Sequence, residues 1–227
     1  MKRSEINMAI QHAINALEAN NMRLPDFAYW PPSEWAGHDI SNIPALGLGW
    51  DVTDFGTGEF PRVGAVLFTV RNGSQANPTF GTPYAEKVIF QLHETAQEIP
   101  FHFHGIKTED IINRGGGVLM LELYNSTAEG ALDKTSEVTV KMDGFLRTFS
   151  PGAIIEVSKG NSITLPPGLY HRFWAKKGAG DLIVGEISSI NDDATDNFFL
   201  EVPKRFTEIL EDEPPKFLLS GDLNGTC

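Results

Sequence analysis

The stretch PFHFHGIKTED, residues 100–110, decides how this chain folds and what it binds. Its two histidines, His102 and His104, are two residues apart, and side chains two apart on a β-strand project from the same face. Phe101 and Phe103 then face the other side, which is the alternation typical of a sheet packed on one face. Both imidazoles are therefore predicted to point toward one place.

A carboxylate follows the histidine pair. Glu109 comes five residues after His104, a distance that lets the chain turn and bring the carboxylate back to the two rings. Two imidazoles and one carboxylate suit divalent Mn, Fe, Co, Ni or Zn, whereas Ca²⁺ and Mg²⁺ prefer more oxygen ligands. The alternative interpretation is a surface strand with two exposed histidines and a solvated glutamate.

A second stretch, GNSITLPPGLYH at residues 160–171, adds a glycine, a Pro-x-Gly turn and a histidine that opens an aromatic segment. Together the two stretches resemble the paired motifs of the cupin superfamily. The first motif is H-x-H, four residues, Glu, six residues, Gly, here His102, His104, Glu109 and Gly116. The second is Gly, five residues, P-x-G-x-x-H, here Gly160, Pro166, Gly168 and His171.

The cupin resemblance implies a jelly-roll barrel in which four residues hold one metal ion: His102, His104, Glu109 and His171. Two positions depart from the pattern, since Ala96 replaces the usual opening glycine and Ala175 replaces a frequent Asn. Both departures fall outside the four ligands.

The resemblance extends to the D-lyxose isomerase family over nearly the whole chain, most clearly at residues 100–117 and in LPPGLYHRFW at residues 165–174. It implies a jelly-roll homodimer that uses Mn²⁺ to interconvert D-lyxose and D-xylulose, and also D-mannose and D-fructose. The substrate would then be a free monosaccharide.

The rest of the chain predicts a mostly β protein. Residues 4–20 have apolar side chains at helical spacing after Ser4, a candidate N-cap. Residues 24–60 are rich in proline, glycine and aromatic side chains, which predicts an irregular arm packed by its rings. Short apolar runs separated by turn residues then predict strands at 63–70, 87–93, 99–104, 118–124, 137–142, 153–157, 162–165, 169–174 and 182–187.

One domain accounts for this pattern. We expect the helix and arm at 1–60, the jelly roll at 61–190 and a C-terminal segment at 191–227, with a short closing helix near 204–211. The single cysteine, Cys227, excludes an intrachain disulfide.

Charge narrows the range of partners. The chain has 30 acidic and 18 Lys or Arg residues, a net charge of -12, which argues against nucleic acid and against an anionic membrane surface. No apolar stretch has the length of a spanning helix or the pattern of a secretion signal, so a cytoplasmic protein is expected.

Aldose–ketose isomerisation by proton transfer requires a base that is not a metal ligand. Glu201 has apolar neighbours after the last predicted strand and is our candidate, with Arg205 to orient it or a sugar hydroxyl. Lys107, within the metal motif, offers a hydrogen-bond donor, or a proton-transfer group if burial lowers its pKa. For each of the three, an exposed surface position is the alternative. Glu186, in the predicted strand 182–187, fits an inward or an outward orientation equally well.

Two other functions fit the same ligands. A cupin dioxygenase with Fe or Ni would consume O₂, and a metal-containing carbohydrate-binding jelly roll would bind sugar without turnover. A phosphosugar isomerase is disfavoured because the chain lacks an obvious Arg/Lys cradle for phosphate.

Overall fold

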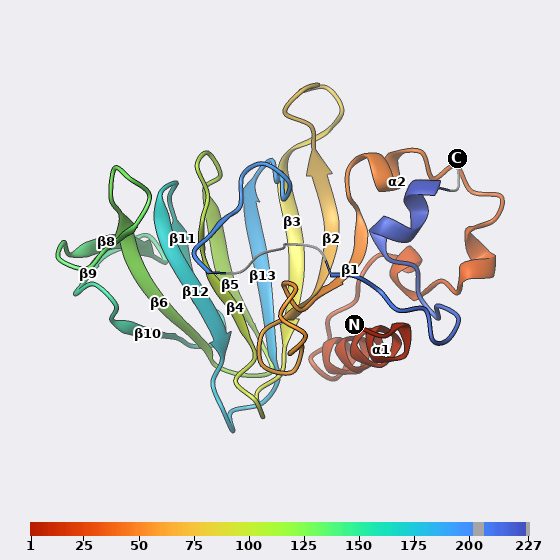
Figure 1. The fold of residues 1–227 in the computed structure, drawn as a ribbon, viewed down its shortest axis with the longest axis horizontal. Helices are drawn as coiled ribbons and strands as arrows, with labels where there is room; N and C mark the ends of the chain where they lie inside the picture. Colours follow the sequence, from red (N-terminus) through yellow and green to blue (C-terminus); the bar gives the residue numbers. More distant parts are fainter. Residues whose placement is uncertain (202–206, 226–227) are drawn as a thin grey trace.

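Residues 1–201 and 207–225 are described by the computed structural model. Two antiparallel sheets pack face to face, and one long helix lies beside the larger sheet (Figure 1). The larger sheet has the order β1-β2-β3-β13-β5-β11-β8-β9, and the smaller has β10-β6-β12-β4-β14, with β7 paired to β6. This arrangement confirms the predicted all-β jelly roll.

The strands are β1 (Gly49–Thr53), β2 (Ala65–Gly73), β3 (Gly81–Gln91), β4 (Glu98–Phe103), β5 (Glu109–Gly115), β6 (Leu119–Ser126), β7 (Leu132–Asp133), β8 (Val138–Met142), β9 (Phe145–Phe149), β10 (Ile154–Val157), β11 (Ser162–Leu165), β12 (Leu169–Ala175), β13 (Leu182–Ser189) and β14 (Phe198–Phe199). The helices are α1 (Arg3–Ala19), η1 (Asp26–Tyr29), η2 (Pro32–Trp35), α2 (Asn42–Ala45) and η3 (Ser220–Gly225).

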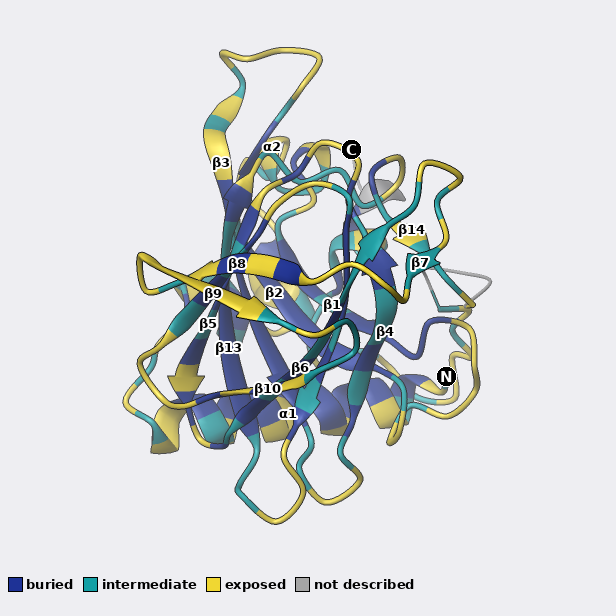
Figure 2. Ribbon diagram, turned by 90° about the vertical axis from the view of Figure 1, so that its left-hand side faces the viewer, coloured by how far each residue is buried: buried dark blue, intermediate teal, exposed yellow. Residues whose placement is uncertain are grey.

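Alternation along the strands builds the core between the two sheets. In β6, Leu119, Leu121 and Leu123 are buried toward the opposite sheet, while the residues between them are only partly buried. Burying a leucine side chain contributes roughly 2 kcal/mol. Of the outermost strands, β9 is largely exposed, and β10 alternates between exposed and buried residues (Figure 2), so the best-shielded part of the barrel lies toward its centre.

A second core lies on the outer face of the larger sheet. Helix α1 buries Ile6, Ile10 and Leu17 there, together with apolar side chains of β1, β2 and β3. The predicted cap is wrong: Ser4 lies inside the first turn, where its N–H and hydroxyl donate to Asp212. The N-cap is Lys2, two residues earlier, and the carboxylates of Glu211 and Asp222 also bind this end of the helix through Arg3.

The aromatic arm packs by its rings, as predicted, but it is not irregular throughout. Residues 49–53 form β1, which pairs with β2 and extends the larger sheet. Trp50 within it donates from Nε1 to the carbonyl of Ala28 at 2.8 Å and contacts Phe68 edge-on. A strand of five residues is too short for its alternation to be separated from the surrounding loop pattern.

Ala96, which replaces the glycine of the cupin pattern, has φ 52° in the turn between β3 and β4. This left-handed conformation costs an L residue roughly 1 kcal/mol, which explains why glycine suits the position. The turn nevertheless closes, because Gln97 N–H donates to the carbonyl of Leu92.

The predicted closing helix is wrong where it is described. Residues 207–211 are not helical, and Leu210 instead forms an isolated parallel bridge with Lys2. The rest of that prediction, residues 204–206 with Arg205, lies outside the described residues, as does Cys227. Within the described ranges, no helix combines the length and apolar character that crossing a bilayer requires.

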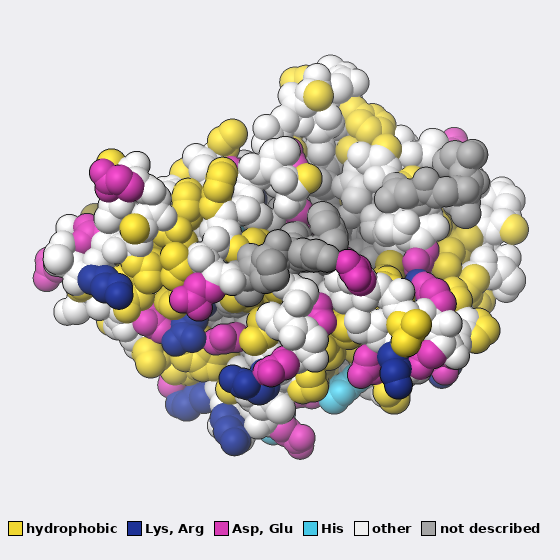
Figure 3. Space-filling model, viewed as in Figure 1, with side chains coloured by type: hydrophobic (Ala, Val, Ile, Leu, Met, Phe, Trp, Pro, Cys, Tyr) yellow, Lys and Arg dark blue, Asp and Glu magenta, His cyan; other side chains and the backbone are white. Residues whose placement is uncertain are grey.

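On the face shown in Figure 3, Lys and Arg side chains are interspersed with Asp and Glu, without a large patch of one sign. This distribution agrees with the sequence, which shows no obvious cluster of Arg and Lys residues.

Candidate metal centre

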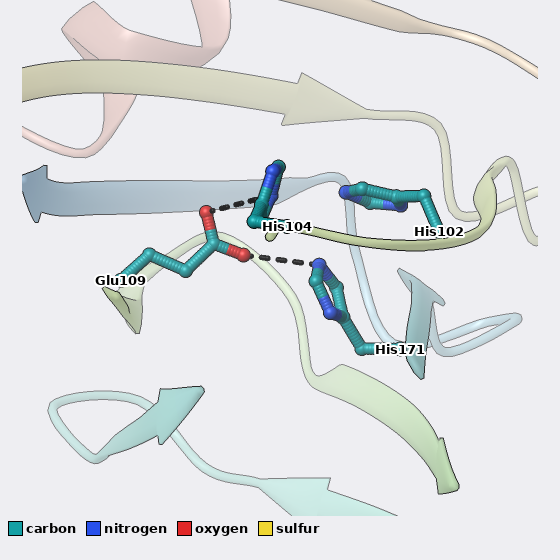
Figure 4. Close-up of side chains that lie close together, drawn as sticks. All are labelled: His102, His104, Glu109 and His171. Atoms are coloured by element: carbon teal, nitrogen blue, oxygen red, sulfur yellow. Dashed lines mark ion pairs between the residues drawn. The ribbon is translucent and has the colours of Figure 1, made fainter. Parts of the chain in front are cut away.

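Strand register brings the histidines together. His102 on β4 lies directly opposite His171 on β12, and their ring centroids are 4.1 Å apart. His104 follows at the end of β4, and Glu109 opens β5 in the other sheet. All four side chains are buried, and their candidate ligand atoms lie within 4.8 Å of one another (Figure 4).

Backbone carbonyls orient the three imidazoles. Nδ1 of His102 lies 2.9 Å from the carbonyl of Pro100, Nδ1 of His104 2.7 Å from that of Asp196, and Nδ1 of His171 2.9 Å from that of Leu169. Because a carbonyl oxygen can only accept a hydrogen bond, we assign the proton of each ring to Nδ1. Nε2 of each ring then carries a free lone pair.

These lone pairs face Glu109. His171 Nε2 lies 3.0 Å from Oε1 and His104 Nε2 lies 3.5 Å from Oε2, yet neither buried nitrogen has a well-formed hydrogen bond. Lone pairs and a carboxylate at such distances repel one another unless a cation lies between them. The residues therefore fit a divalent transition-metal ion.

The electrostatics favour the metal-binding forms of His102 and Glu109. Burial, reinforced by His171 and His104, holds the pKa of His102 well below its ordinary value. Burial alone would raise the pKa of Glu109, but the attraction of the Lys107 ammonium holds it well below its usual range. Neutral imidazoles and a carboxylate are the forms that metal binding requires.

The lowered pKa of His102 makes stability depend on pH. Below about pH 6.5, His102 becomes protonated in the unfolded chain but stays neutral in the folded metal-free protein. Lowering the pH therefore reduces the free energy of unfolding, by at most about 1.4 kcal/mol per pH unit from this residue. His102→Gln, which cannot titrate, should give a shallower slope in urea unfolding with EDTA between pH 7.5 and 5. Parallel slopes for the two proteins would contradict this assignment.

Charged side chains line a cavity together with His102, His104 and Glu109. Lys107 Nζ lies 2.7 Å from Glu109 Oε2 and 3.0 Å from Glu186 Oε1. Lys87, the cross-strand neighbour of Glu186, approaches it to 3.8 Å and donates to Asn191 Oδ1 at 2.8 Å. This cavity is small, about 40 Å³, and it shares Leu67, Lys87 and Asp193 with a second cavity of about 620 Å³.

The predicted catalytic residues lie in different places. Lys107 is buried in the cavity wall, and its pKa is raised, because the attraction of Glu109 and Glu186 outweighs the effect of burial. The condition for its use as a proton-transfer group is therefore not met, and the role of hydrogen-bond donor remains. Glu186 points inward and is 5% exposed. Glu201 is exposed and lines a different pocket, beside Arg172. Arg205 lies outside the described residues.

Three functional candidates were missed by the sequence analysis: Lys87, Asn191 and Asp196. Lys87 could have been noticed in the sequence, because a lysine in an apolar strand needs a polar partner if it is buried. Asn191 and Asp196 lie in the polar segment NDDATDN at residues 191–197, in which nothing distinguishes one acidic residue from the next.

Comparison with known proteins places this geometry among sugar isomerases. The profile of the D-lyxose isomerase family matches residues 1–223. The D-lyxose/D-mannose isomerase of Serratia proteamaculans is 43% identical over 222 residues, covering 96% of each chain, and that of Escherichia coli O157:H7 is 44% identical over 226 residues, covering 98% of each.

Solved structures share the fold. An L-ribose isomerase variant from Acinetobacter sp. DL28, in complex with L-ribose, has a TM-score of 0.61 at 12% identity and covers 92% of this chain and 98% of its own. The L-ribose isomerase of Cellulomonas parahominis with L-ribose has a TM-score of 0.54 at 15% identity, with the same coverage.

Proposed function

Because this chain belongs to the D-lyxose isomerase family, we propose that it is a metal-dependent aldose–ketose isomerase that interconverts D-lyxose and D-xylulose, and also D-mannose and D-fructose. The observation that carries the proposal is the buried set of three histidines and Glu109, together with the inward Glu186 carboxylate and Lys107, which line the same cavity as His102, His104 and Glu109. Mn²⁺ as the ion and a homodimer are parts of the proposal that follow from the family resemblance, and a cytoplasmic location remains the expectation drawn from the sequence pattern.

His102, His104, Glu109 and His171 would hold the ion. When bound, it supplies a Lewis acid that polarises the carbonyl and the neighbouring hydroxyl of the open-chain sugar. The lowered pKa values of His102 and Glu109 favour the forms in which these two side chains bind a metal ion.

Glu186 moves the carbon-bound proton in this proposal, and Lys107 donates a hydrogen bond. The Glu186 carboxylate removes the proton on C2 of the aldose and returns it to C1, while the Lys107 ammonium, whose raised pKa keeps it protonated, donates a hydrogen bond to O1. The proton of the O2 hydroxyl passes to O1, and the ketose forms with both side chains in their starting forms. The 3.0 Å contact between the two groups supports this pairing.

We assign the base to Glu186 in place of Glu201 because of where the two carboxylates lie. Glu186 lines the cavity that contains His102, His104 and Glu109, whereas Glu201 is exposed beside Arg172 and Glu98. A base has to be within hydrogen-bond reach of the proton it removes, directly or through one water.

Removal and return of the metal test the proposal. Protein stripped with EDTA should not convert D-lyxose or D-mannose, and Mn²⁺ should restore ketose formation at the same rate with and without O₂. Consumption of O₂ without ketose would support the dioxygenase instead. Saturable sugar binding without turnover would support the carbohydrate-binding jelly roll.

A further inference from the structure

The loop between β4 and β5 is held by a carboxylate from a distant part of the chain. Asp196 Oδ1 accepts hydrogen bonds from the N–H groups of Gly105 at 2.8 Å and Ile106 at 3.0 Å, and Oδ2 accepts one from Lys107 N–H at 2.9 Å. Successive backbone N–H groups can form an anion-binding concavity. Here a carboxylate that is only 4% exposed fills it.

The same residue orients one of the three histidines. The backbone carbonyl of Asp196 receives the Nδ1 proton of His104, across 92 positions of sequence. His102 and His171 instead donate to carbonyls two residues earlier in the chain. Among the three, therefore, only His104 is oriented by a segment outside its own stretch of chain.

The loop packs tightly against this carboxylate. A Cβ added at Gly105 would lie 3.2 Å from Asp196 Oδ1 and 3.3 Å from a ring carbon of Phe198, closer than most real contacts. The next side chain, Ile106, is 68% exposed and so provides no buried anchor for the loop. Hydrogen bonds to Asp196 thus restrain the backbone of residues 105–107 directly.

We propose that Asp196 is a positioning residue for the metal centre: through its carboxylate it fixes the loop that carries Lys107, and through its carbonyl it fixes His104. The inference rests on the proposed function and adds to it a residue that acts on the ion through His104. Charge-assisted hydrogen bonds are about twice as strong as neutral ones, so the loss of the charge should loosen the loop.

The test compares Asp196→Asn with the matched variant Asp192→Asn, using Mn²⁺ titrated into stripped protein. Asn has the same shape as Asp, but an NH₂ group replaces one of the two oxygens. This group cannot accept the hydrogen bonds that the backbone N–H groups of the loop donate to the carboxylate. Loss of such outer partners typically costs about 10–100-fold in metal affinity, and we expect that increase in the Mn²⁺ dissociation constant. Among the described residues, the Asp192 carboxylate accepts from the N–H groups of Ala194 and Thr195 and from the Thr195 hydroxyl, all in its own loop, so its variant should bind Mn²⁺ like the parent.

Circular dichroism must show that the Asp196→Asn protein is folded at the assay temperature. If it does not fold, Gly105→Ala decides, since it displaces the same contact while retaining the carboxylate and should also weaken Mn²⁺ binding. Parental Mn²⁺ affinity in a folded Asp196→Asn protein, or in Gly105→Ala where that variant decides, would overturn the inference.

Failure of the inference is distinguishable from failure of the proposed function. If the parent protein binds Mn²⁺ but converts no sugar, the proposed function is wrong and the role of Asp196 stands. If the parent protein binds no Mn²⁺, both are wrong. If the parent protein binds Mn²⁺ and converts sugar, and Asp196→Asn binds Mn²⁺ with equal affinity, only the role of Asp196 is wrong.

Discussion

Glu186→Gln is expected to lower kcat by about 10²–10⁴-fold, the usual contribution of a positioned general base, while Mn²⁺ binding is unchanged. Gln has nearly the same size and can still accept from Lys107 Nζ, which lies 3.0 Å from Glu186 Oε1. It cannot take the proton from C2. Steady-state rates with D-lyxose at saturating Mn²⁺, together with the metal content of the variant, measure the effect.

The matched control is Glu201→Gln, which removes the same charge from an exposed position outside the cavity. It should turn over within about threefold of the parent, because surface substitutions usually have small effects. A large loss in Glu201→Gln with near-normal turnover in Glu186→Gln would return the base to Glu201.

His171→Ala is expected to lose both bound metal and activity. His171 is 1% exposed, and its Nε2 is 3.0 Å from the Glu109 carboxylate, so its removal leaves three ligands around a gap. Since loss of an outer partner already costs about 10–100-fold in affinity, loss of a ligand should cost more than about 100-fold. Elemental analysis after gel filtration and rates at micromolar Mn²⁺ measure the two losses.

His12→Ala is the control for that substitution. His12 lies on α1 and pairs with Asp181 at 2.8 Å, with its side chain 53% exposed. This variant should retain its metal and its rate. Parental activity in a His171→Ala protein shown to be free of metal would refute the role of the ion.

Local geometry suggested only part of the candidate ligand set. The spacing of His102 and His104 predicted one shared face, and Glu109 follows His104 by five residues, but the set of four came from the resemblance to the cupin motifs. His171 required the second motif, since its place opposite His102 arises from pairing between strands that are distant in sequence.

The orientation of Glu186 was not predictable, for a physical reason. Strand β13 lies in the middle of the larger sheet and is covered on both faces, so Val184 belongs to the core between the sheets and Ile183 to the core under α1. A strand buried on both faces shows no alternation of apolar and polar residues. The inward direction of its carboxylate is therefore visible only in the fold.

Glu201 was chosen for its apolar neighbours, and one of them, Phe199, does line the metal cavity. Strand β14 ends at that residue, however, and Leu200 bonds to the backbone of Phe101, so the alternation does not continue to Glu201. Asp196 escaped prediction because its role consists of contacts about 90 residues away along the chain.

The most direct test of proton transfer at a metal centre is NMR of D-lyxose in D₂O with stripped protein, before and after Mn²⁺ is added. The account predicts D-xylulose only after Mn²⁺ is added, with solvent deuterium at C1, because the base exchanges its proton before returning it. Ketose that forms without Mn²⁺, ketose that carries no deuterium, or no ketose at all would contradict it.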